Sequence, residues 1–299
     1  MIHVFLTLLL LGPAALGEQT APPPRSQASD AKTRDVYVTV TDSSGAPAQN
    51  LTVKDFAVRE DGSPREVLRV APATAPMQIA VLIDDSQAST AAVQQMREAL
   101  AAFADKLDGK AEIAFVTVGE RPTTMVEYTT SAAALKKGLG RLFARPGSGA
   151  YLLDGVIDVS RGLKKREATR PVIVALTFEG VEFSTRPYEL VLEELEASGA
   201  AFHVLAVGTP GSMHNDEMRN RNVVLADGTS RTGGRREQLL TELAIPDRMK
   251  QLADELTHQY VVTYARPDTL IPPKRIDVSV TVPGLKARAR TRLPSGKSD

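Results

Sequence analysis

Two patterns of hydrophobic residues divide the chain. In its first part apolar and polar residues alternate, as in Val36, Val38 and Val40, and turn residues such as 60–63 (EDGS) separate the alternating segments. Alternation with a period of two is typical of strands that bury one face. We therefore predict a small β-module over residues 35–75.

The pattern changes at residue 76, where continuous apolar runs begin to alternate with helical patterns. The runs cover residues 78–83, 113–118, 171–178, 201–207 and 259–264. Such runs are typical of strands buried on both faces of a parallel sheet. Between the first two, apolar residues recur at spacings of three and four, as on one face of a helix, and residues 123–128 predict an edge strand. We predict an α/β domain over residues 76–266, a doubly wound, mostly parallel sheet flanked by helices, with 259–264 as its last strand.

The end of the chain alternates again. Residues 275–282 (RIDVSVTV) and 286–292 flank a Pro-Gly turn, which predicts a β-hairpin. We expect this C-terminal hairpin, within residues 267–293, to pack with the N-terminal β-module, so that the module is built from both termini. Residues 294–299 then form a tail.

The N-terminus has the pattern of a targeting segment. Residues 4–16 (VFLTLLLLGPAAL) are apolar but too few to span a membrane, and a small-residue cleavage pattern ends at Gly17. This is typical of a signal peptide, here residues 1–17. Residues 18–34 are rich in Pro, Ser and Ala and predict a linker. We expect an exported protein, periplasmic or secreted, with no membrane span in the mature chain.

Composition argues against several classes of function. The 36 Lys and Arg residues balance 36 Asp and Glu residues, so no net charge attracts the protein to nucleic acid. The absence of Cys excludes disulfides, thiolate metal sites and cysteine nucleophiles. The sequence contains neither a Gly-x-Ser-x-Gly motif nor a phosphate-binding loop. We therefore predict a protein that is not an enzyme and does not bind nucleic acid.

Oxygen-bearing side chains follow two of the predicted buried strands. Asp84 to Ser89 (DDSQAS) come directly after residues 78–83, and Glu179 follows residues 171–178. The carboxyl ends of parallel strands form the edge of the sheet where ligands bind. Carboxylate and hydroxyl oxygens suit Mg²⁺, Ca²⁺ or Mn²⁺, but Asp and Ser also cap helix N-termini. The residues alone leave both interpretations open.

The Asp-x-Ser sequence of Asp84 and Ser86, at the end of a buried strand, resembles the von Willebrand factor type A (vWA) domain. The segments VYVTVTDSSGAPAQNLTVKDFAVREDGSPREV and ELTHQYVVTYARP resemble an exported bacterial vWA-related family, and the resemblance covers residues 35–293. In vWA domains a metal-ion-dependent adhesion site (MIDAS) holds a divalent cation with Asp-x-Ser-x-Ser, a Thr from a second loop and an Asp from a third.

The resemblance implies a degenerate MIDAS. Asp84 and Ser86 match the first two ligands and Glu179 stands at the third-loop Asp, whereas Ala88 and Ala150 stand where the family has Ser and Thr. Alanine offers no oxygen, and Mg²⁺ requires near-ideal octahedral coordination. We expect Asp84, Ser86 and Glu179 to bind Mg²⁺ or another divalent cation weakly or not at all.

The resemblance also implies a protein-interaction or adhesion module, whose partner is a protein that contacts the rim of the site. The residues expected to contact it are Asp85, Ser89, Ser148, Ala150, Arg219 and Arg221. Both arginines lie in a long polar stretch, residues 211–236, which is either a recognition loop or a surface insertion. Two alternatives stay open: a metal-free scaffold of an envelope complex, and a hydrolase that uses the strand-end carboxylates.

Overall fold

The computed structural model describes residues 1, 31–209, 215–267, 271 and 273–292. The predicted signal peptide beyond residue 1, the linker up to residue 30 and the predicted tail lie outside the described residues. Among the described residues, no helix is both long and apolar enough to cross a membrane.

The larger part of the chain is an α/β domain around one six-stranded sheet of order β10-β9-β8-β5-β6-β7. Five strands run parallel: β5 (Met77–Ile83), β6 (Ala111–Thr117), β8 (Pro171–Phe178), β9 (Ala201–Val207) and β10 (Arg236–Leu239). The edge strand β7 (Thr123–Thr129) is antiparallel to β6. The predicted fold class, a mostly parallel sheet flanked by helices, is confirmed.

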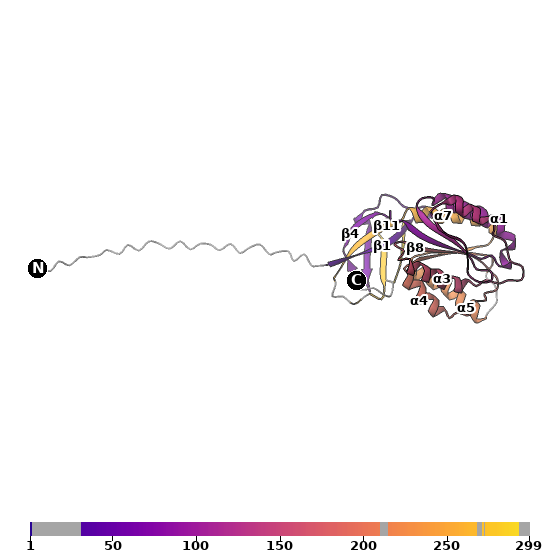
Figure 1. The fold of residues 1–299 in the computed structure, drawn as a ribbon. Helices are drawn as coiled ribbons and strands as arrows, with labels where there is room; N and C mark the ends of the chain where they lie inside the picture. Colours follow the sequence, from indigo (N-terminus) through magenta and orange to yellow (C-terminus); the bar gives the residue numbers. More distant parts are fainter. Residues whose placement is uncertain (2–30, 210–214, 268–270, 272, 293–299) are drawn as a thin grey trace.

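Helices cover both faces of this sheet (Figure 1). One face carries α1 (Val93–Lys106), α2 (Ala132–Leu139) and α7 (Ile245–Thr257). The other carries α3 (Leu152–Lys165), α4 (Tyr188–Ser198), α5 (Asp216–Val223) and the short α6 (Thr229–Thr232). A π-helical turn, Val224–Gly228, joins α5 to α6.

The continuous apolar runs supply both cores because side chains alternate across a strand. In β5, Ile79, Val81 and Ile83 pack into the core beneath α1 and α7, whereas Ala80 and Leu82 pack into the core beneath α3 and α4. All five are fully buried. This explains why a run without polar residues is required in the central strand of a sheet covered on both faces.

The β-module consists of two smaller sheets. One has the order β13-β1-β11-β4, and the other has the order β12-β2-β3. The strands are β1 (Ala31–Thr41), β2 (Phe56–Glu60), β3 (Ser63–Arg65), β4 (Val67–Pro72), β11 (Tyr260–Pro267), β12 (Ile276–Val280) and β13 (Lys286–Ala289). Val36, Val38 and Val40 are buried, as the alternation predicts, and their core includes Phe56 and Tyr260, whose rings lie 5.7 Å apart.

Two predicted strand assignments are wrong. The run at 259–264 is not the last strand of the large sheet, because β11 pairs with β1 and β4 in the β-module. The edge strand next to β9 in the large sheet is β10, which has only one buried residue, Leu239. The two C-terminal strands do not pair with each other either, since β12 pairs with β2 and β13 with β1.

The interpretation of residues 211–236 as a polar loop or insertion is wrong for its described part. Residues 215–236 contain α5, the π-helical turn, α6 and the start of β10. Met218, Val224 and Leu225 are buried, and the last two pack against α3 and α4. The apolar residues are too few and too widely spaced among polar ones to show this helical face in the sequence.

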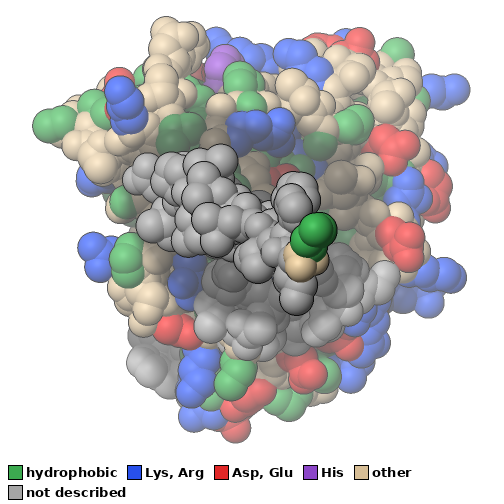
Figure 2. Space-filling model, turned by 90° about the vertical axis from the view of Figure 1, so that its left-hand side faces the viewer, with side chains coloured by type: hydrophobic (Ala, Val, Ile, Leu, Met, Phe, Trp, Pro, Cys, Tyr) green, Lys and Arg blue, Asp and Glu red, His purple; other side chains and the backbone are tan. Residues whose placement is uncertain are grey.

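The β-module lies at the amino ends of the parallel strands, so their carboxyl ends face away from it (Figure 1). Arg170, just before β8, donates hydrogen bonds to the carbonyls of Ala73 and Leu256, which flank the module. A buried ion pair between Arg288 of β13 and Glu255 of α7, 2.5 Å apart, also fixes the module on the sheet. On the face of the molecule that the β-module forms, acidic and basic side chains lie interspersed (Figure 2).

Candidate functional site

Asp84 ties together the carboxyl ends of β5 and β8. Its Oδ1 accepts a hydrogen bond from the backbone N–H of Ser86 at 3.0 Å. Its Oδ2 accepts hydrogen bonds from the Thr177 hydroxyl and the Phe178 N–H, both at 3.1 Å. We call the edge of the large sheet where its parallel strands end the carboxyl edge. Asp84 is buried there, and three donors hold its carboxylate.

The side chain of Asp85 contacts other residues of this protein and is not accessible to a partner, so the prediction that it contacts a partner is wrong. It is 2% exposed. Its Oδ1 accepts a hydrogen bond from Gly119 N–H at 2.6 Å, and its Oδ2 accepts one from Arg145 Nε at 2.8 Å. The hydrogen bond to Asp85 raises the pKa of Arg145. Asp85 therefore anchors the loop between α2 and α3 to the edge.

Ser86 and Ser89 lie at the start of a 3-10 helix, Gln87–Ala92. The Ser89 hydroxyl donates to the Ser86 carbonyl at 2.8 Å, and Ser89 is fully buried. Ser89 therefore cannot contact a partner, and that expectation is wrong. Ala88 is exposed between them, and a Cβ placed on Gly180 would come within 2.8 Å of its methyl group, so the first and third loops touch here.

The second loop carries Ala150 and Ser148. Ala150 forms a β-bridge with Glu182 of the third loop: its N–H donates to Val181 O at 2.8 Å and its carbonyl accepts from Phe183 N–H at 2.7 Å. It is 4% exposed, so it joins the loops and does not select a partner. Ser148 is half-buried, and its hydroxyl donates to the Arg145 carbonyl at 2.9 Å.

Glu179 is paired with a guanidinium from α5. Arg221 Nη1 lies 3.7 Å from Glu179 Oε2, and Arg221 is only 1% exposed. Its Nη2 donates to Thr177 Oγ1 at 3.3 Å and to the Phe178 carbonyl at 3.1 Å. The same Thr177 hydroxyl donates to Asp84, so Arg221 lies between Asp84 and Glu179. It therefore places a permanent positive charge among the strand-end carboxylates.

The two predicted partner-binding arginines of α5 have opposite surroundings. The Arg219 side chain is 70% exposed and lies 3.8 Å from Asp216, so it is accessible to a partner. Arg221 is buried beneath the edge and is not accessible, which corrects that expectation. The sequence of residues 211–236 is polar throughout, so it does not show which of Arg219 and Arg221 points inward.

Glu182 is a functional candidate that we did not predict. It is buried, and its Oε1 accepts hydrogen bonds from Leu152 N–H at the start of α3 and from Ser184 N–H, both at 3.1 Å. Its Oε2 is buried and has no hydrogen-bond partner among the described residues. Burial raises the pKa of Glu182 to about 7, against the opposing effects of the Ser184 hydrogen bonds and of Arg221. A second acidic residue three positions after Glu179 was the only signal in the sequence.

The raised pKa of Glu182 predicts a pH-dependent stability. Below its ordinary pKa the carboxyl is protonated in both folded and unfolded chains, and between that value and about 7 only the folded chain keeps the proton. Folding stability should therefore fall as pH rises through this window. Relative to wild type, Glu182→Gln should gain about 3 kcal/mol of unfolding free energy between pH 4.5 and 8.

Chemical denaturation of both proteins across this pH range measures the effect. Glu193→Gln, which changes an exposed carboxylate on α4, serves as the control and should show no such gain. A Glu182→Gln difference that stays constant with pH would contradict the assignment of a neutral, buried carboxyl.

The residues at this edge fit a divalent cation poorly. Ala88 and Ala150 provide no side-chain oxygen, and Glu179 is already paired with Arg221 and accepts a hydrogen bond from Gln238 at 3.4 Å. Over the described ranges, no three His, Cys, Asp or Glu side chains are grouped to hold a metal ion. A metal held by Asp84, Ser86 and Glu179 stays a prediction that this donor set does not favour.

Exposed apolar side chains also follow the carboxyl ends of two strands of this sheet. We use the term apolar rim for Val181, Phe183, Leu240 and Leu243, which follow the carboxyl ends of β8 and β10 and are 43–81% exposed. Phe183 packs on Tyr151, with ring centroids 5.8 Å apart. The 3-10 helix Gln87–Ala92 lies between the rim residues that follow β8 and those that follow β10, because it contacts Gly180 on one side and Glu242–Ala244 on the other. Sequence reasoning passed over these residues because they fall outside the periodic segments.

Comparison with known proteins identifies the fold. No protein-family model matches the sequence, and no curated protein matches it. Among solved structures, a von Willebrand factor type A protein from Catenulispora acidiphila matches 82% of this chain and 73% of its own, at 15% identity and a TM-score of 0.51. Proximal thread matrix protein 1 from the mussel byssus, with a zinc-occupied MIDAS motif, matches 66% of this chain and 49% of its own, at 16% identity and a TM-score of 0.51. The resemblance expected from the sequence is thus confirmed at the level of architecture, and this chain has the fold of the von Willebrand factor type A domain.

Proposed function

We propose that this chain is an exported, non-catalytic vWA-type interaction module that binds a protein partner through the apolar rim without a metal ion. The observation that carries the proposal is the position of the rim. Nine large hydrophobic residues are exposed among the described ones, and the four of the rim all follow the carboxyl ends of strands of the large sheet, two after β8 and two after β10. Exposed apolar groups gathered at a ligand-binding edge are a common feature of protein-interaction sites.

The polar interior of the edge supports a rigid, preassembled binding face. Asp84 joins the ends of β5 and β8, Asp85 joins the α2–α3 loop, and Glu182 holds the start of α3. These groups are buried, and the hydrogen bonds that they make lie within the protein, while Glu182 Oε2 makes none with the described residues. A partner would therefore meet apolar side chains and backbone, with Arg219 as an accessible charge at the border. Export rests on the apolar run of residues 4–16.

The chemistry of the edge supports binding over catalysis. The Ser89 hydroxyl donates its hydrogen bond to the backbone carbonyl of Ser86 and not to a side-chain base. The two histidines in the described part of the chain are His203, buried inside β9, and His258, which follows α7 near the β-module. Of the strand-end carboxylates, Asp84 and Glu179 are both engaged, and Glu182, whose Oε2 makes no hydrogen bond with a described residue, is buried.

Arg221 supports metal independence, because a fixed guanidinium balances the carboxylates and repels a second cation. We expect the thermal unfolding midpoint of the mature chain to be the same in EDTA as in millimolar Mg²⁺, Ca²⁺ or Mn²⁺. A ligand that binds only the folded state must raise the midpoint. A saturable rise in wild type that is absent in Asp84→Ala would instead establish a metal-dependent adhesion site.

A further inference from the structure

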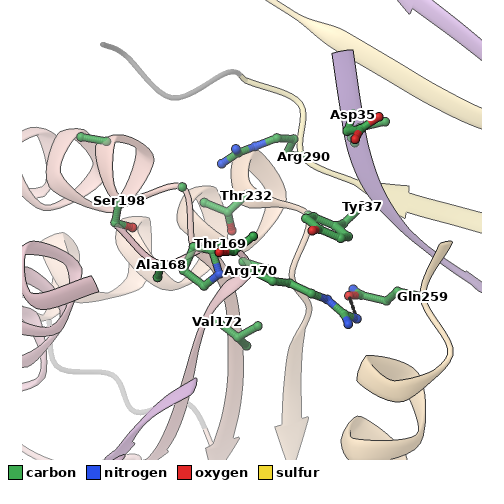
Figure 3. A pocket seen from close by; sticks show the side chains of 16 residues that line it. Asp35, Tyr37, Ala168, Thr169, Arg170, Val172, Ser198, Thr232, Gln259 and Arg290 are labelled. Atoms are coloured by element: carbon green, nitrogen blue, oxygen red, sulfur yellow. Dashed lines mark hydrogen bonds between the residues drawn. The ribbon is translucent and has the colours of Figure 1, made fainter. Parts of the chain in front are cut away.

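A cavity lies at the opposite end of the sheet from the apolar rim, between the α/β domain and the β-module. Its volume is about 420 Å³, within the size range of small-molecule sites. The module contributes Tyr37 of β1 and Arg290, which follows β13, and the α/β domain contributes residues at the start of β8, the end of α4 and α6 (Figure 3). The apolar rim is at the far end of the strands, so this cavity is separate from the proposed partner-binding face.

Arg290 is held in place by its backbone. A Cβ on Gly233 would come within 2.5 Å of the Arg290 nitrogen, so only glycine, here at a φ of 82°, allows α6 to end against this strand. The next residue, Thr291, donates its N–H to the Arg231 carbonyl at 2.9 Å. These contacts fix where the Arg290 side chain leaves the backbone, and it extends toward the side of the cavity formed by Ser198 and Thr232 (Figure 3).

Among the described residues, the Arg290 guanidinium has no counterion. It makes no ion pair and no hydrogen bond with any described residue, and its Nε is inaccessible to solvent. Glu196, which acts on it through space, is itself paired with Arg231 at 3.0 Å. Burial lowers the pKa of Arg290 to about 10. The half-buried Arg290 thus places a positive charge beside the cavity without a carboxylate partner among the described residues.

A second guanidinium lines the same cavity and also lacks an acidic partner among the described residues. Arg170 is 4% exposed and donates only to neutral acceptors, among them Leu256 O at 2.5 Å and Gln259 Oε1 at 2.6 Å. It stacks over the Tyr37 ring at 5.2 Å. Its Nε is buried with no hydrogen-bond partner among the described residues. Neutral carbonyls fix the guanidinium but leave its charge uncompensated.

The acidic residue that lines this cavity is Asp35. It is exposed, and its Oδ1 accepts the Thr263 hydroxyl at 2.5 Å. Two arginines against one exposed carboxylate leave the cavity with a net positive charge. The Tyr37 ring, Val36, Pro171 and Val172 add apolar wall beside these charges.

We propose that this cavity binds a small organic anion, with its carboxylate or phosphate group at Arg290 and its apolar part against Tyr37. An arginine presents several donors in a planar fork that matches either oxyanion. Since the lining comes from both parts of the molecule, the bound anion stabilises the junction of the β-module with the α/β domain. The site is independent of the proposed partner binding.

Thermal unfolding with citrate and with inorganic phosphate, each against chloride at equal ionic strength, tests the proposal. The carboxylate and the phosphate probe show which oxyanion the site prefers. In wild type we expect a saturable rise of the midpoint with at least one of them. In Arg290→Gln the apparent dissociation constant should rise at least about tenfold, which corresponds to one hydrogen-bonded charge.

Arg292→Gln is the matched control, because Arg292 is an exposed arginine two residues further along. It should respond to the anions as wild type does. Arg290→Gln removes an unpaired charge and should fold at least as stably as wild type, so a lost response cannot come from unfolding. The proposal is overturned if neither anion raises the wild-type midpoint above the chloride reference, or if Arg290→Gln responds like wild type.

Discussion

Replacing Arg221 with Met should lower the free energy of unfolding by about 3–5 kcal/mol, the usual cost of removing one partner from a buried ion pair. Methionine keeps most of the length of the side chain but removes its charge and all donors. Glu179 then loses its cation, and the Thr177 hydroxyl and the Phe178 carbonyl each lose a hydrogen bond. Glu182 also loses the positive charge that favours its ionised form.

Denaturation in urea measures this loss, with the midpoint and slope taken from the same curves. Arg219→Met is the matched control, since it changes an arginine of the same helix whose side chain is 70% exposed. Its effect should stay within about 0.5 kcal/mol. Equal effects of the two substitutions would show that Arg221 does not balance the strand-end carboxylates.

Replacing Leu243 with Asp should weaken partner binding by at least about 30-fold, the equivalent of about 2 kcal/mol for a residue central to an interface. The side chain is 68% exposed, so the variant should keep its fold. In the complex, however, the new carboxylate would lose its water against an apolar partner surface without gaining a cation. The loss of affinity should appear mainly as faster dissociation.

Leu68→Asp is the control for this variant. Leu68 is an exposed leucine of β4 in the β-module, at the other end of the molecule from the apolar rim. Surface plasmon resonance measures the affinity of wild type and of both variants for the captured partner. The comparison shows whether the partner binds at the apolar rim or at the β-module. If Leu68→Asp weakens binding as much as Leu243→Asp does, the partner does not recognise the rim.

Much of the α/β domain could be predicted from the sequence because its central strands are buried on both faces. β5 and β8 have almost no polar residues, and such a run is typical of a strand that is covered on both faces. β10 could not be found this way. Its sequence, REQL, has one apolar residue, and it is a strand only because its backbone pairs with β9.

The assignment of strands to sheets was the weaker inference. β11 is apolar enough for either sheet, and burial of Val262 and Tyr264 in the β-module core decides where it lies. The two C-terminal strands are joined by a turn, but β12 and β13 find their partners in two different sheets. Pairing between segments more than 200 residues apart leaves no local signal.

At the carboxyl edge, the sequence indicated which loops meet but not what their side chains do. The order of the strands placed Asp84, Ala150 and Glu179 at one edge. Whether each side chain faces solvent depends on contacts with distant segments, such as the pairing of Glu179 with Arg221. The polar residues at the strand ends therefore left a weak metal site and helix capping as open interpretations, whereas in the structure Asp84 and Glu179 are engaged by neighbouring groups of the protein.

The central claim is that the carboxyl edge binds a protein partner without a metal ion. The most direct test is affinity capture from the envelope and extracellular fractions of the source organism, with immobilised wild-type chain in EDTA and in Mg²⁺. We expect the same partner to be retained by the wild-type chain in both buffers and to be lost from Leu243→Asp in both. Capture that requires Mg²⁺ and disappears in EDTA would contradict it.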